Sequence, residues 1–163
     1  MDMTVVVVLS SIAAVTLGAG AQRPPDGSRT VVFVCEHGNV KSLIAREWFN
    51  RRASERGLDF RALSRGLTTE PSVPPAIADA LRGDGFDVSG FEPRALSAAD
   101  AKGAVRVVGI GVDLSSAPAR GDRPLDTWEG IPRASEGYAA SRDALRRRIE
   151  VLLRALENAE GRR

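Results

Sequence analysis

The feature that most constrains the fold is a run of β-branched and aromatic residues that ends at the only cysteine of the chain, Cys35. Residues 30–34 predict a fully buried strand, and residues 42–56, with an apolar face and Gly57 as a stop, predict a helix. The polar loop between them places the thiol beneath the positive end of a helix. Such a loop can bind an anion through its N–H groups, and its field favours the thiolate, the nucleophilic form of cysteine.

Strand and helix signals alternate along the rest of the chain, which has 163 residues and 43% hydrophobic content. This alternation predicts one α/β domain, a three-layer sandwich in which a four-stranded parallel sheet is flanked by helices. Further strands are expected at residues 60–64, 104–110 and near 123–125, and helices at 75–83, 97–101 and from a capping Ser135 onward. Ligands of such sheets bind beyond the carboxyl ends of the strands, where Cys35 falls.

The N-terminal stretch does not belong to this pattern. Residues 4–17 are apolar, and the small residues 19–21 fit a signal-peptidase site. We therefore predict a signal peptide at residues 1–21, a linker at 22–29 and the folded domain at 30–160. Cleavage would export the protein to the periplasm or the medium and leave no membrane span; without cleavage it would be cytoplasmic or membrane-anchored. A single cysteine excludes an internal disulfide.

Charge and composition argue against nucleic acid as a binding partner and against a bound metal. The net charge is +2, and the densest basic run, Arg146–Arg148, shares its predicted helix with Glu150, which is typical of a solvated face and not of a nucleic-acid site. With one histidine and one cysteine, the chain falls short of any usual metal-ligand pattern. No cofactor and no metal are expected, and the oligomeric state is open.

The cysteine loop resembles that of the low-molecular-weight protein tyrosine phosphatase superfamily, which also contains arsenate reductases. The family pattern is a strand, Cys, five residues, Arg, Ser or Thr, and a helix; here Cys35 is followed by five residues, Lys41 and Ser42. The resemblance extends over residues 30–158. It includes Ser64-Arg65-Gly66 after the second strand, the stretches 85–89 and 94–96, and Trp128 with a proline shortly after it.

This resemblance implies the roles of the loop residues. Cys35 would attack phosphorus and form a phosphocysteine, and the Ser42 hydroxyl would stabilise the thiolate. Gly38 and Asn39 are expected to supply unusual backbone angles, and Glu36 to point to solvent. The predicted anion-binding loop consists of Glu36, His37, Gly38, Asn39, Val40 and Lys41.

Two parts of the family pattern are changed. Lys41 stands in place of the arginine, so the positive charge is kept and the bidentate fork is lost. The acid loop reads Trp128-Glu129-Gly130-Ile131-Pro132-Arg133, and Arg133 occupies the place of the aspartate that protonates the leaving group. Glu129 and then Asp126 are the nearest candidate acids, with Glu136 a poorer one. His37 could pair with the thiolate, donate a proton or simply cap a backbone group.

Three functions fit these residues. The leading hypothesis is a cysteine-dependent hydrolase of phosphomonoesters, with phosphotyrosine as the usual family substrate. The second is an arsenate reductase that uses an external small thiol. The third is a catalytically weak oxyanion-binding protein on the same scaffold, favoured by Lys41 and the missing Asp-Pro pair.

Overall fold

The computed structural model describes residues 29–115, 117 and 125–162. The predicted signal peptide lies outside the described residues, as do all but the last residue of the predicted linker and two of the three residues predicted for the fourth strand. Within the described part of the chain, no helix has both the length and the apolar character needed to span a membrane.

The sheet has four parallel strands in the order β2-β1-β3-β4, which confirms the predicted α/β class. β1 is central and fully buried, and its last residue, Cys35, lies opposite Gly66 of β2. The strands are β1 (Thr30–Cys35), β2 (Arg61–Gly66), β3 (Arg106–Ile110) and β4 (Leu125–Trp128).

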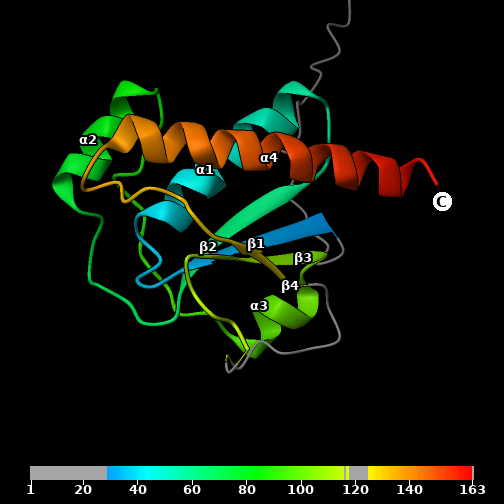
Figure 1. Cartoon of the computed structure of the whole chain (residues 1–163), viewed down its shortest axis with the longest axis horizontal. Helices are drawn as coiled ribbons and strands as arrows, with labels where there is room; N and C mark the ends of the chain where they lie inside the picture. Colours follow the sequence, from blue (N-terminus) through cyan, green and yellow to red (C-terminus); the bar gives the residue numbers. More distant parts are fainter. Residues whose placement is uncertain (1–28, 116, 118–124, 163) are drawn as a thin grey trace, which may run out of the picture.

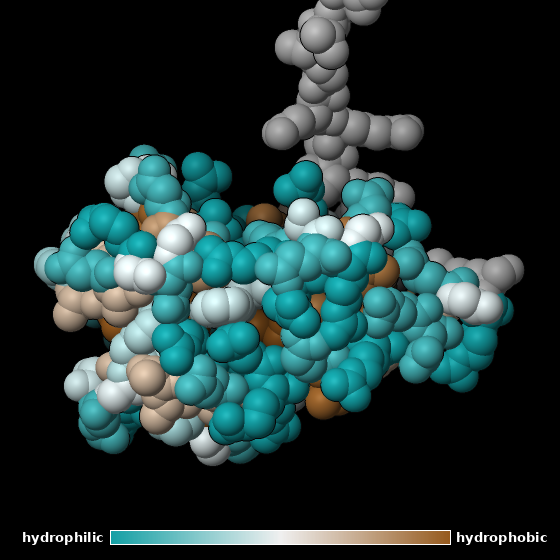
Figure 2. All heavy atoms as spheres, turned by 90° about the horizontal axis from the view of Figure 1, so that it is seen from above, coloured by the Kyte–Doolittle hydropathy of each residue, from teal (hydrophilic) through white to brown (hydrophobic). Residues whose placement is uncertain are grey.

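Helices cover both faces, which completes the predicted three layers (Figure 1). The long helix α4 (Tyr138–Glu160) and α1 (Lys41–Glu55) lie on one face together with α2 (Pro75–Gly83), and α3 (Ala98–Gly103) lies on the other. Figure 2 shows that the surface over α4 is mainly hydrophilic. On this surface Arg146 stacks on the Trp48 ring, 4.3 Å from its centroid.

The core follows from the alternation of side chains along β1. Val31 and Phe33 point into the cluster formed with α1 and α4, and the next residues along the strand, Val32 and Val34, point toward the α3 side. The Phe33 ring packs edge-on against Phe49, with centroids 5.7 Å apart. Burying each such side chain contributes about 1.5–3 kcal/mol, so β1 is held rigidly from both faces.

The predicted start of the last helix is wrong. α4 begins at Tyr138, with Gly137 as its N-cap and no side-chain cap, so Ser135 does not cap it. The Glu136 N–H donates to the Arg133 carbonyl at 3.1 Å and closes a turn before the helix. Ser135 lies within this turn, three residues before the helix starts.

The cysteine loop rests on the exit of β2 through two glycines. Gly38 has φ +71°, and a Cβ on it would lie 2.6 Å from the Gly66 nitrogen. A Cβ on Gly66 would lie 2.7 Å from the His37 carbonyl carbon and 2.8 Å from the Gly38 nitrogen, and it would collide with the Thr68 carbonyl oxygen. Side chains therefore do not fit between the two backbones.

We predict that Gly66→Ala destabilises the fold by about 3 kcal/mol or more, because an added methyl group has only backbone atoms to displace. Gly90→Ala is the matched control, since a Cβ there meets nothing within 4 Å. Thermal or urea denaturation of the two variants measures the difference. Equal stability of both would show that the contact between the loop and β2 is not tightly packed.

Candidate active site

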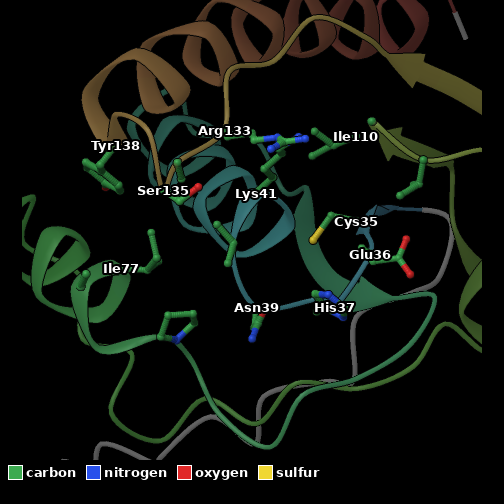
Figure 3. Close-up of a pocket in the computed structure, with 16 residues that line it drawn as sticks. Cys35, Glu36, His37, Asn39, Lys41, Ile77, Ile110, Arg133, Ser135 and Tyr138 are labelled. Carbon is green, nitrogen blue, oxygen red and sulfur yellow. The ribbon is translucent and has the colours of Figure 1, made fainter.

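A cavity of about 760 Å³ opens beyond the carboxyl ends of β1 and β3 (Figure 3). Cys35 is on its wall and only 6% exposed. The lining comes from the cysteine loop, the start of α2, the residues after β3 and the segment that leads into α4. The place of the cavity agrees with the expectation for a parallel sheet.

A chain of hydroxyl groups runs from the cysteine into the core. Cys35 Sγ lies 3.0 Å from Ser42 Oγ, which lies 2.8 Å from Ser64 Oγ, and Ser64 Oγ is 2.9 Å from the Gly38 carbonyl oxygen. Each hydroxyl has one proton to donate. With a thiolate, Ser64 donates to Ser42 and Ser42 donates to sulfur; with a thiol, the donations run the other way and end on the Gly38 carbonyl. The chain thus serves both protonation states of Cys35.

Lys41 is the first residue of α1 and lines the cavity beside Cys35. A cation at a helix N-terminus opposes the helix dipole, and the first turn of α1 carries no acidic residue to offset it. The lysine passes close to Gly111, which has φ +64° and whose added Cβ would lie 3.2 Å from Lys41 Nζ. An anion bound at this end of α1 would turn the unfavourable charge into a favourable one.

The other loop residues hold the loop in shape. Asn39 is fully buried, and its Nδ2 donates to Glu70 Oε2 and to the Ser72 carbonyl, both at 2.8 Å. Its φ is not positive, so Asn39 contributes its side chain and not an unusual backbone angle, contrary to expectation; Gly38 does adopt one, as predicted. Glu36 is exposed, and its carboxylate points away from the middle of the cavity (Figure 3).

His37 is turned toward the loop that follows β2. Its Nδ1 lies 3.0 Å from Thr68 Oγ1, and its Nε2 lies 3.7 Å from Glu70 Oε1. The ring lines the cavity, and no hydrogen bond joins it to Cys35 in the described part of the chain. Through these contacts His37 holds the cysteine loop against the loop that follows β2.

The two leading candidate acids, Glu129 and Asp126, do not line this cavity. Asp126 lies on β4, with Oδ2 3.8 Å from Arg106 Nε, and lines a different cavity together with Trp128 and Arg148. Glu129 is exposed, and its carbonyl oxygen accepts a hydrogen bond from Arg148 at 3.3 Å. Neither residue belongs to the described lining of the Cys35 cavity.

Residues that the sequence did not assign to the site form its opposite wall. Tyr138 presents its ring to the cavity, while its hydroxyl donates to Asp84 Oδ2 at 2.6 Å. Burial and this hydrogen bond raise the pKa of Tyr138 well above its usual value, so the hydroxyl stays protonated. Ile77 of α2 and Ile110 of β3 make much of the wall apolar. Apolar character alone does not distinguish a residue of the core from one that lines a cavity, and only the fold shows that these two face the cavity.

Comparison with known proteins agrees with this geometry. The family model described as "Low molecular weight phosphotyrosine protein phosphatase" matches residues 30–110, from the first residue of β1 to the last of β3. The chain belongs to the low-molecular-weight phosphatase superfamily. No curated protein matches it.

Solved structures of this superfamily share the fold. The low-molecular-weight protein tyrosine phosphatase from T. tengcongensis is 24% identical, with a TM-score of 0.67 over 77% of this chain and 98% of its own. The YwlE arginine phosphatase from Geobacillus stearothermophilus is 17% identical, with a TM-score of 0.66, and the match covers 81% of this chain and 95% of that protein.

An arsenate reductase is similar to the same degree. The thioredoxin-dependent enzyme of Corynebacterium glutamicum is 20% identical, with a TM-score of 0.66, and the match covers 80% of this chain but 62% of that protein. Solved structures similar to this chain thus include both phosphatases and an arsenate reductase. At these identities the similarity shows the fold alone.

The described residues offer no cluster of three or more His, Cys, Asp or Glu side chains that could hold a metal ion. The side chains that line the cavity include a thiol, hydroxyls and two cations.

We predict that Lys41→Met weakens binding of inorganic phosphate to the full-length reduced chain by about tenfold or more, since one charge in a partly desolvated site is lost. Thermal stability should not fall, because the variant removes a cation from a helix N-terminus. Isothermal titration calorimetry provides the measurement, with the exposed Lys102→Met on α3 as the charge-matched control. Unchanged affinity in Lys41→Met would exclude Lys41 from the anion site.

Proposed function

We propose that the chain is a cysteine-dependent phosphatase that hydrolyses phosphomonoesters of the phosphotyrosine type through a phosphocysteine. The observation that supports it most is the place of Cys35: its sulfur is hydrogen-bonded to Ser42 at the wall of an open cavity, beside the N-terminus of α1. A thiol in such a field can act as a thiolate toward a bound oxyanion.

The proposed reaction has two steps. The Cys35 thiolate attacks phosphorus, an S–P bond forms, and the P–O bond to the leaving group breaks with its electron pair on oxygen. Water then attacks phosphorus, the S–P bond breaks, and thiolate and phosphate are released. Lys41 and the loop N–H groups hold the transferred oxygens through both steps. Ser42 donates to sulfur whenever sulfur carries the charge.

The source of the proton for the leaving oxygen is where this chain differs most from the family pattern, because no aspartate follows Trp128 in the acid loop. Apart from Cys35 itself, His37 and Glu36 are the described residues of the cavity with an imidazole or carboxyl group that could carry a proton to the leaving oxygen. His37 is braced by Thr68 and Glu70, and Glu36 points outward. We therefore expect the rate to depend strongly on how stable the leaving group is as an anion.

Arsenate reduction is a second candidate, because Cys35 lines an open cavity that an external small thiol could enter. Cys35 would attack arsenic and displace hydroxide. An external small thiol would then attack the Cys35 sulfur and form a mixed disulfide with it, and the two electrons of the S–As bond would remain on arsenic and reduce it. A second external thiol would restore Cys35. Without a second cysteine, the chain itself cannot complete this cycle.

We predict that the full-length, reduced chain hydrolyses p-nitrophenyl phosphate and that Cys35→Ser abolishes this turnover while phosphate binding and thermal stability are retained. The p-nitrophenolate group leaves readily without a proton, so a poor general acid does not hide the activity. Release of p-nitrophenolate is followed by absorbance across pH.

Turnover that survives in Cys35→Ser would contradict the covalent mechanism. If the unmodified chain binds phosphate without turnover, the same assay with arsenate and an external thiol separates the second candidate from a non-catalytic oxyanion-binding protein. Formation of arsenite that depends on Cys35 would establish the reductase.

A further inference from the structure

Arg133 lies where the resemblance to the phosphatases places the acid, yet it lines the same cavity as Cys35 and Lys41. In Figure 3 its guanidinium extends from the segment before α4 toward Ile110. The two cations come from different parts of the fold, since Lys41 begins α1 and Arg133 precedes α4. The cavity lining therefore carries two cationic side chains, contributed by separate elements of the fold.

The backbone at Arg133 is fixed while its side chain is free to bind. Ile131 and Ala134 on either side are buried, and the Arg133 carbonyl accepts from the Glu136 N–H at 3.1 Å. The side chain itself is 77% exposed, and the described residues offer it one ion pair, at 3.6 Å, to Glu136, which is 69% exposed. Such a surface pair contributes little to stability, so a bound anion can replace Glu136.

A guanidinium at this position cannot do what an aspartic acid does. It keeps its proton throughout the physiological pH range, so it is unable to protonate a leaving oxygen. It presents a planar fork of N–H donors that binds phosphate or carboxylate oxygens in a bidentate way. Arg133 is therefore suited to hold a leaving group that is already an anion.

We propose that Arg133 forms a second anion subsite through which the cavity also accepts substrates whose leaving group carries its own negative charge, phosphoanhydrides in particular. This inference rests on the proposed cysteine-dependent phosphatase mechanism and extends it beyond phosphomonoesters to a second substrate class. Lys41 and the loop N–H groups hold the phosphoryl group that is transferred, and Arg133 holds the anion at the other side of the bond that breaks. The apolar side chains of Ile77 and Tyr138 leave room for an organic group on that second phosphate.

The reaction is balanced without a general acid. The Cys35 thiolate attacks one phosphorus of the anhydride, the S–P bond forms, and the bond to the bridging oxygen breaks. The electron pair remains on that oxygen, and the leaving phosphate departs as an anion paired with Arg133. Water then breaks the S–P bond, regenerates the thiolate and gives a second phosphate, which takes the protons of the water.

Binding tests the subsite without any turnover. In the full-length Cys35→Ser chain, we expect inorganic pyrophosphate to bind about tenfold more tightly than inorganic phosphate, as measured by isothermal titration calorimetry. Adding Arg133→Gln should weaken pyrophosphate binding by about tenfold and phosphate binding by less than about twofold. Arg133→Lys should restore part of the lost affinity, since it keeps the charge and loses the fork.

Arg82→Gln is the matched control. Like Arg133, Arg82 is exposed and forms an ion pair with an acidic residue three positions away, Asp79, but it does not line the cavity. It should leave both affinities unchanged. Equal weakening of pyrophosphate and phosphate in Arg133→Gln would place Arg133 on the transferred phosphoryl group and overturn the proposal. No weakening of either would remove Arg133 from the site.

Kinetics separates this inference from the proposed function. In the chain with Cys35 intact, Arg133→Gln should lower kcat/KM for pyrophosphate about tenfold more than for p-nitrophenyl phosphate. A proportional loss for both substrates overturns the inference and leaves the phosphatase proposal standing. Absence of Cys35-dependent turnover of both substrates contradicts the phosphatase proposal, while the pyrophosphate affinities still decide whether Arg133 forms an anion subsite.

Discussion

The contact between Gly38 and Gly66 is the constraint on which the site depends. It brings the backbone of the cysteine loop directly against the exit of β2, closer than any side chain would permit. Because Ser64 lies two residues before Gly66, the same contact sets Ser64 Oγ within hydrogen-bond distance of both the Gly38 carbonyl and Ser42. The shape of the loop and the hydroxyl chain to Cys35 thus have one structural origin.

Positive charge is concentrated at this end of the sheet at some expense to stability. Lys41 begins α1, where a cation is unfavourable, and the buried Asn39 leaves its Oδ1 without a partner among the described residues. Features that cost stability in the free protein and favour a bound anion are typical of functional sites. On the opposite wall, Tyr138 is tethered through Asp84, which lets its ring shape the cavity without its hydroxyl entering it.

The sequence predicted what local patterns determine. β1 is predicted by its continuous run of β-branched and aromatic residues, and α1 and the last helix by their apolar faces. The relation of Ser42 to Cys35 is implied by the resemblance to the phosphatase family. What depended on tertiary contacts was not predicted. Asn39 was expected to act through its backbone and acts through its side chain, because its partners Glu70 and Ser72 come from a loop more than thirty residues away. Asp126 is near the predicted acid loop in sequence, yet β4 directs it to Arg106.

Trapping the covalent intermediate tests the proposed mechanism most directly. The full-length, reduced chain is mixed with p-nitrophenyl phosphate, denatured rapidly and examined by mass spectrometry of its peptides. A phosphocysteine mechanism predicts one added phosphoryl group on Cys35, present during turnover and absent in Cys35→Ser. Steady turnover with Cys35 unmodified at every time point, or a phosphoryl group on another residue, would contradict it.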